Sequence, residues 1–211
     1  MKVIGIVGSR RKKGNTSILV KEALKAFEKK NFEVELIYLS DYNYKDCCGC
    51  EGCKDTYKCV IKDDMQKLYP KILEADAMII GSPTYFYNMT ADMKAFLDRL
   101  YCYEIFDEED RSVWMGLNEA LGWKYASVIA VCEQDNENDM GYTAISMEKT
   151  LTALGYRVVD VLKVLRLVSA GEAKNDGEVM LNAYKLGKKL LKTLELREKA
   201  KEKLKNFKAN I

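Results

Sequence analysis

MKVIGIVGSRRKKGNTS, residues 1–17, joins a short apolar run to a polar loop and to the start of a helical pattern. The apolar, partly β-branched run at residues 2–7 predicts a buried strand. Apolar side chains then recur at helical spacing over residues 16–30 and predict an amphipathic helix. A strand, a short loop and a helix form the first half of a βαβ crossover, so this stretch predicts a parallel sheet covered by helices.

The rest of the chain repeats this alternation of strand and helix. We predict five strands, at residues 2–7, 33–39, 77–81, 126–132 and 157–165. We predict five helices, at residues 16–30, 64–74, 91–101, 142–154 and 178–194. The expected fold class is therefore α/β, with a doubly wound parallel sheet and helices on both faces.

Length and composition suit one main domain. The 211 residues include 48% hydrophobic side chains, which is enough for a core on both faces of a sheet. We place this domain at residues 1–194 and a charged helical extension, free to fray or to pack on a partner chain, at 195–211. No apolar run approaches the roughly 18 residues of a membrane span, so we expect a soluble, cytoplasmic protein with no membrane partner.

The loop at residues 8–17 lies where the first helix begins. Unpaired amides at a helix N-terminus, hydroxyl groups and basic side chains together favour a bound phosphate. It is not a Walker loop, because Asn15 and not Lys follows Gly14. The alternative is that Asn15 or Thr16 merely caps the helix.

A second loop, GSPTYFYN at residues 81–88, follows the third strand. In a doubly wound sheet, the loops after the first and third strands flank the crevice where nucleotide-like ligands bind. Pro83 makes the turn rigid, and three adjacent aromatic residues offer surface to a planar ring. We therefore expect the two loops to form one ligand site.

A third segment, the cysteine loop at residues 40–62, holds five of the seven cysteines. Cys47, Cys50, Cys53 and Cys59 supply four thiolates within a compact run like those that hold 4Fe-4S clusters in ferredoxins. Zinc and metal-free thiols are the alternatives, and Cys48 is a rival to Cys47 as ligand. Cys102 and Cys132 are expected in the core.

The chain has no histidine, which removes the commonest general base and the commonest metal ligand after cysteine. No nucleophile with a paired base is visible, so we assign no catalytic side chain. Asp63 and Asp64 precede a predicted helix and are interpreted as its cap and first turn.

The segments GSRRKKGNTS, CCGCEGCKDTYKCVIKDDM and SPTYFYNMTADMKAFLDRL, in this order, resemble the NADPH-dependent FMN reductase superfamily, in particular its iron-sulfur flavoprotein branch. The resemblance covers roughly residues 1–165 and implies a flavodoxin-like fold with strand order 2-1-3-4-5. It implies that the FMN phosphate lies in the first loop and the isoalloxazine ring against the second. The residues so assigned to FMN are Ser9, Arg10, Arg11, Asn15, Thr16, Ser17, Pro83, Thr84, Tyr85, Phe86 and Asn88.

The expected function is that of an iron-sulfur flavoprotein, which uses FMN and a 4Fe-4S cluster to link a two-electron couple to a one-electron carrier. We expect a ferredoxin-like carrier or a small-molecule acceptor as partner, and a homodimer or homotetramer. The runner-up is a cluster-free NAD(P)H-dependent FMN or quinone reductase. A zinc-stabilised module with a nucleic-acid-binding tail is disfavoured, because the basic residues of 185–208 are not interleaved with aromatic readers, and we expect no nucleic-acid partner.

Overall fold

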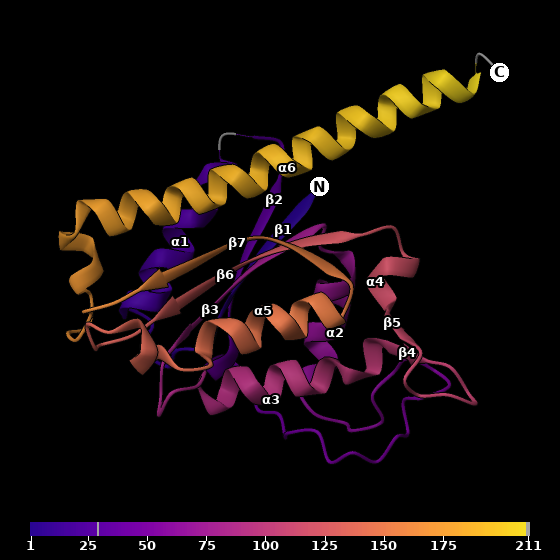
Figure 1. The fold of residues 1–211 in the computed structure, drawn as a ribbon, viewed down its shortest axis with the longest axis horizontal. Coiled ribbons are helices and arrows are strands. Elements are labelled where there is room, and N and C mark those ends of the chain that lie inside the picture. Colours follow the sequence, from indigo (N-terminus) through magenta and orange to yellow (C-terminus); the bar gives the residue numbers. More distant parts are fainter. Residues whose placement is uncertain (29, 210–211) are drawn as a thin grey trace.

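The computed structural model describes residues 1–28 and 30–209 and contains a five-stranded parallel sheet (Figure 1). Its strands are β1 (Lys2–Val7), β2 (Glu33–Tyr38), β3 (Ala77–Pro83), β6 (Lys124–Val131) and β7 (Tyr156–Val164). They lie in the order β2-β1-β3-β6-β7, and every neighbouring pair is parallel. Counted within the sheet alone, this is the order 2-1-3-4-5, so the predicted flavodoxin-like α/β fold is confirmed.

Helices cover both faces of the sheet, and two separate cores result (Figure 1). One face carries α1 (Asn15–Glu28) and α6 (Gly177–Ala209), and the other carries α2 (Met65–Glu74), α3 (Ala91–Arg99) and α5 (Thr143–Ala153). Successive strand side chains point to opposite faces, so Val3 and Val7 of β1 pack under α1 and α6 while Ile4 and Ile6 pack on the other side.

One segment differs from the expectation, and another extends it. The connection at residues 103–124 is not a plain loop: it forms a hairpin of β4 (Glu104–Phe106) and β5 (Trp114–Gly116), then the short helix α4 (Leu117–Ala120). The helix predicted at 178–194 and the helical extension predicted at 195–211 form one continuous helix, α6, which runs to Ala209, since Lys, Glu, Leu and Ala favour helix throughout. Arg197 fixes this continuation by an ion pair of 2.6 Å to Asp76, which precedes β3.

The charged end of α6 beyond Arg197 extends past the body of the molecule (Figure 1). Leu204 and Phe207 are exposed on this end, and Leu196 is exposed just before it. No helix within residues 1–28 and 30–209 has the length and apolar character to cross a membrane.

The fold separates the two predicted sites. Thr90, at the start of α3, donates from Oγ1 to the carbonyl of Gly8 at 2.6 Å and so joins α3 to the phosphate loop. The cysteine loop starts near the carboxyl end of β2 but runs alongside α3, where Tyr44 donates to Asp92 O at 2.8 Å. Its cysteines lie near Arg99, at the other end of α3. The carboxyl edge of the sheet and the cysteines thus lie at opposite ends of this helix.

Candidate functional site

The loop between β1 and α1 is built as an anion site. The N–H of Gly14 donates to Arg11 O at 2.7 Å, and the N–H of Ile18 donates to Gly14 O at 3.1 Å. Helix geometry therefore leaves the N–H groups of residues 15–17 without a carbonyl acceptor in the first turn. These amides and the positive end of the helix dipole attract a phosphate.

Some side chains of this loop line a cavity of about 120 Å³ at the carboxyl edge of the sheet, and others hold the loop in place. Ser9, Arg11 and Thr16 line it. Arg10 does not, because its guanidinium points to Asp92, with hydrogen bonds of 2.8 and 2.9 Å. Ser17 is fully buried and donates to Lys12 O at 2.9 Å, so its hydroxyl supports the loop from below.

Asn15 lines the cavity but uses its amide to hold another segment. Its Nδ2 donates to Ser169 O at 2.9 Å, and its Oδ1 accepts from Ala173 N–H at 3.1 Å. Both partners belong to the connection between β7 and α6, which forms one rim of the cavity through Leu167 and Val168. No local sequence pattern predicts this rim, because the two segments are more than 150 positions apart.

The aromatic loop forms a tight turn at the carboxyl edge of β3. Tyr85 and Asn88 exchange backbone hydrogen bonds of 2.7 and 3.1 Å, and the two residues between them, Phe86 and Tyr87, have φ angles of 45° and 64°. Left-handed backbone is unfavourable for aromatic residues, so neighbouring structure must hold it. Tyr142 N–H donates to Tyr87 O at 2.7 Å, and Gly141, with φ of 55°, packs so closely on Tyr87 that a side chain would overlap it.

Two adjoining cavities lie between these loops. One, of about 120 Å³, contains the phosphate loop, Pro83 and Thr84, and the other, of about 510 Å³, contains the aromatic turn. Thr84, Tyr85 and Glu133 line both. The Thr84 hydroxyl is buried and has no hydrogen-bond partner in the described part of the chain, so it is free to bond a ligand. Phe86 is 99% exposed at the rim. Asn88, also assigned to the ligand, bonds within the turn and lines neither cavity.

A separate cavity gathers the cysteines. A space of about 20 Å³ is lined by Cys47, Cys50, Cys53 and Cys59, the four cavity cysteines, together with Arg99 and Cys102. Cys48 does not line it and is exposed. Within residues 1–28 and 30–209, no three Cys, Asp or Glu side chains converge closely enough to hold a single metal ion. The structure therefore brings the four cysteines to one cavity without placing three of them in the geometry of a single-ion site.

The thiols of the cysteine loop differ in their surroundings. The backbone N–H of Gly52 and the Cys48 side chain lower the pKa of the exposed Cys50 thiol. Burial raises the pKa of Cys53, and raises that of the deeper Cys102 to about 12. Cys102 and Cys132 are both buried, as the sequence predicted for core cysteines.

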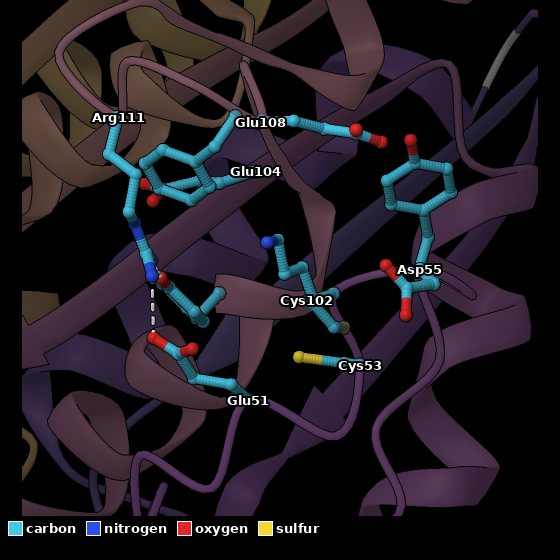
Figure 2. Close-up of a pocket in the computed structure, with 11 residues that line it drawn as sticks. Glu51, Cys53, Asp55, Cys102, Glu104, Glu108 and Arg111 are labelled. Atoms are coloured by element: carbon cyan, nitrogen blue, oxygen red, sulfur yellow. Dashed lines mark hydrogen bonds and ion pairs between the residues drawn. The ribbon is translucent and has the colours of Figure 1, made fainter.

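Beyond Cys53 the space continues into a larger pocket of about 220 Å³ under the β4–β5 hairpin (Figure 2). Arg111 reaches across it to Glu51 at 2.6 Å. Cys53 and Cys102 line both this pocket and the cysteine cavity. Glu104, whose pKa is raised by burial, lines the pocket wall. The 103–124 connection therefore lies against the pocket beside Cys53 and Cys102.

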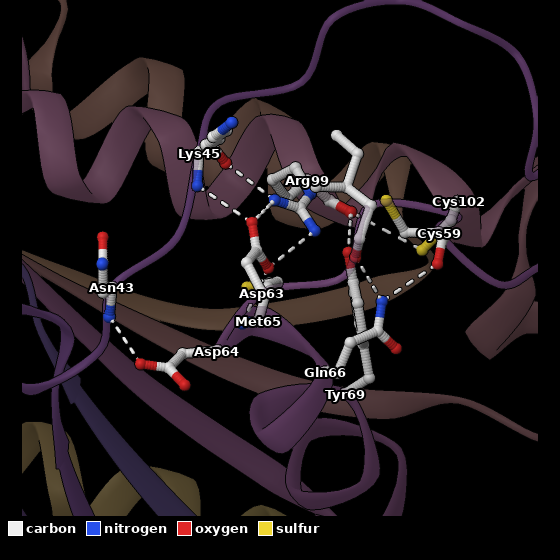
Figure 3. A network of polar contacts seen from close by, with 11 residues as sticks. Asn43, Lys45, Cys59, Asp63, Asp64, Met65, Gln66, Tyr69, Arg99 and Cys102 are labelled. Carbon is white, nitrogen blue, oxygen red and sulfur yellow. Dashed lines mark hydrogen bonds and ion pairs between the residues drawn. The ribbon is translucent and has the colours of Figure 1, made fainter.

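Arg99 is the site residue that sequence analysis missed. Its side chain is buried, and its guanidinium contacts both Asp63 and the backbone of Lys45 (Figure 3). Asp63 also accepts from Met65 N–H at 3.0 Å, so its predicted role at the start of α2 is combined with this ion pair. The pairing joins positions 36 apart and leaves no local pattern in the sequence.

Solved structures of other proteins have the same fold. An azoreductase from Bacillus anthracis superposes with a TM-score of 0.67 at 14% identity, over 90% of this chain and 99% of that one. A flavodoxin from the domain Archaea superposes with a TM-score of 0.55 at 18% identity, over 92% and 99%. At such low identity these matches define the fold class alone, which is flavodoxin-like.

Sequence comparison defines the family. The model of the family described as NADPH-dependent FMN reductase matches residues 1–139, and the chain belongs to this family. An iron-sulfur flavoprotein of Methanocaldococcus jannaschii is 48% identical over 99 residues, which are 47% of this chain and 51% of that protein. One of Archaeoglobus fulgidus is 45% identical over 103 residues, 49% of this chain and 47% of that protein. The match thus spans about half the length of these curated relatives.

Proposed function

We propose that this chain is an iron-sulfur flavoprotein, an oxidoreductase that binds FMN at the carboxyl edge of its sheet and a 4Fe-4S cluster on its four cavity cysteines. The observation that carries the proposal is the cysteine cavity: four thiols at ferredoxin-like spacing line one space in a chain of an FMN reductase family. The names of the relatives, iron-sulfur flavoproteins, support it.

The residues at the carboxyl edge fit FMN. Free amides and Arg11 suit its phosphate, and the larger cavity beside the aromatic turn suits a planar ring. The buried Thr84 hydroxyl supplies an unused hydrogen-bonding group between the two. A phosphate at one end and an aromatic surface at the other match the two ends of the FMN molecule.

The cysteine cavity fits a cluster better than a single ion. Four thiolates at short spacings are the usual ligands of a multi-iron cluster, whereas zinc normally takes two pairs of ligands separated by a longer stretch of chain. The cavity excludes Cys48, which favours Cys47 as the ligand. Cys102 lies behind the cavity as a buried thiol whose high pKa keeps it protonated.

FMN, when bound, exchanges two electrons and the cluster one, so together they would link a two-electron couple to a one-electron carrier of the ferredoxin type or to a small-molecule acceptor. The side chains of the protein bind and orient the two groups. The β4–β5 hairpin borders the pocket beside Cys53 and Cys102, and the rim at Leu167 and Val168 borders the flavin site.

We also propose that the working pair of cofactors lies on two chains of a homodimer or homotetramer. Within one chain, α3 separates the two sites, and its nine residues span about 13 Å. The cysteine cavity adjoins an open groove of about 580 Å³ between α3 and α5, in which a second chain could bring its flavin close to Cys47. A chain with Cys50→Ala, mixed with a chain that has lost FMN through Arg11→Ala and Thr16→Ala, should regain activity in a verified mixed oligomer. No recovery would place the electron path within one chain.

The deciding experiment is anaerobic purification followed by an absorption spectrum and analysis of FMN, iron and sulfide. The proposal expects FMN together with about four irons and four sulfides per chain. Cys50→Ala should lose iron and keep FMN, while the matched variant Cys48→Ala should keep both. FMN without iron in the wild-type protein, with NAD(P)H oxidation, would instead support a cluster-free FMN or quinone reductase.

A further inference from the structure

Arg99, the last residue of α3, carries a buried positive charge beside the cysteines. The residue is 1% exposed, and its side chain is the largest of those fully buried in the described part of the chain. The Asp63 carboxylate pairs with this charge and accepts two hydrogen bonds, from Arg99 Nη1 at 2.7 Å and from Arg99 Nη2 at 3.1 Å. Burying an arginine costs free energy unless its charge is paired. The ion pair with Asp63 is therefore needed to keep the Arg99 guanidinium buried.

The pair joins the two chain segments on either side of the four cavity cysteines (Figure 3). Arg99 Nη1 also donates to the carbonyl of Lys45 at 2.7 Å, two residues before Cys47. Asp63, four residues after Cys59, accepts from Lys45 N–H at 3.0 Å. One ion pair therefore closes the loop and fixes it to the end of α3.

Two observations direct the positive end of the pair toward the cysteines. Arg99 lines the cysteine cavity and Asp63 does not. The Nε–H of Arg99 is buried and has no acceptor within the described residues, although Nη1 and Nη2 are both bonded. An unused, charge-assisted donor on a residue that lines the cysteine cavity suits an anionic acceptor that the protein itself does not provide.

We propose that Arg99 is a positioning residue that closes the cysteine loop and whose charge raises the reduction potential of the bound cluster. The proposal rests on the cluster assigned under Proposed function. Reduction adds one negative charge to a group that four thiolates already make anionic, so a fixed cation beside it favours the reduced form. Asp63 opposes this effect from the far side of the guanidinium.

The test is a redox titration of the holoprotein, followed by electron paramagnetic resonance, with charge changes of opposite sign. Arg99→Met should lower the equilibrium constant for reduction about tenfold, which is 59 mV for one electron. Asp63→Asn should shift the potential the other way, and Arg99→Lys, which keeps the charge, should stay near wild type. Lys94→Met is the matched control, because it removes an exposed lysine, paired to Asp98, from the same helix. The control should leave the potential unchanged.

A shift of the same sign in Arg99→Met and Asp63→Asn, or no shift in either, overturns the inference. If Arg99→Met does not retain iron, the other two variants decide: a lower potential in Arg99→Lys, or no rise in Asp63→Asn, overturns it. The failure of the proposed function looks different, since then the wild-type protein itself contains no iron and sulfide.

Discussion

The two neighbouring arginines of the phosphate loop should contribute very differently to FMN binding. Arg11 lines the cavity, whereas Arg10 is held by two hydrogen bonds to Asp92. We therefore expect Arg11→Ala to weaken FMN binding and Arg10→Ala to change it little, although each removes one positive charge from the same loop.

The structure sets the size of the effect. A hydrogen bond to a charged group contributes about 1.5–3 kcal/mol, and Arg11 is exposed, so its contribution should lie near the lower value. About 1.5 kcal/mol corresponds to a roughly tenfold higher Kd for FMN. Arg10 is already paired and solvated, so its loss should change Kd by no more than about threefold.

Titration of the apoprotein by quenching of flavin fluorescence measures both values. Riboflavin, which lacks the phosphate, should bind the two variants and the wild type with equal affinity. An equal loss of FMN affinity in both variants would mean that the loop acts through net charge alone. A loss of riboflavin affinity in Arg11→Ala would mean that the substitution damages the site as a whole.

Three further outcomes are expected. Replacing any one of the four cavity cysteines by Ala should lower the iron content below half while FMN stays bound, whereas Cys48→Ala should keep its iron; the reverse result for Cys47 and Cys48 would correct the ligand set. Gly141→Ala should lower the melting temperature of the apoprotein, because the new side chain overlaps Tyr87 and left-handed backbone costs an alanine about 1 kcal/mol or more. An unchanged melting temperature would show that the contact with Gly141 does not hold the aromatic turn. Burial opposes ionisation of Asp63, yet hydrogen bonds from Arg99 and two backbone amides lower its pKa in the folded protein below 3.8. The stability that the ionised Asp63 contributes above pH 3.8 should therefore be lost as the pH falls through its lower folded-state pKa. Acid unfolding of Asp63→Asn that matches the wild type would contradict this.

The strands and most helices could be predicted because their signals are local. The strand at 2–7 has the predicted bounds, and the helix predicted at 142–154 is α5, shorter by one residue at each end. Alternation of apolar runs and amphipathic periods is enough to define a doubly wound sheet. The β4–β5 hairpin was missed because its strands have only three residues each and contain Glu104 and Gly116, which do not favour strands.

The residues of the candidate sites likewise fall into two groups, those that local sequence predicts and those whose roles depend on the folded chain. Spacing alone brought the four cavity cysteines together, since all lie within one short segment. The roles of Arg10, Asn15 and Arg99 depend on Asp92, Ser169 and Asp63, which come close only in the folded chain. A single sequence shows which residues have useful chemistry, but not which of them are already engaged with each other.

The two hydrogen bonds of the Asn15 amide have a consequence for how fast a ligand leaves. They join the first turn of α1 to the rim formed by the connection between β7 and α6, so the rim cannot move away from the phosphate loop unless both bonds break. Such a restraint slows departure more than it changes contacts in the bound state, and its effect falls mainly on the dissociation rate. We expect Asn15→Ala to shorten the residence time of FMN, measured by stopped-flow exchange against an excess of an FMN analogue. An unchanged residence time would show that the flavin leaves by another route.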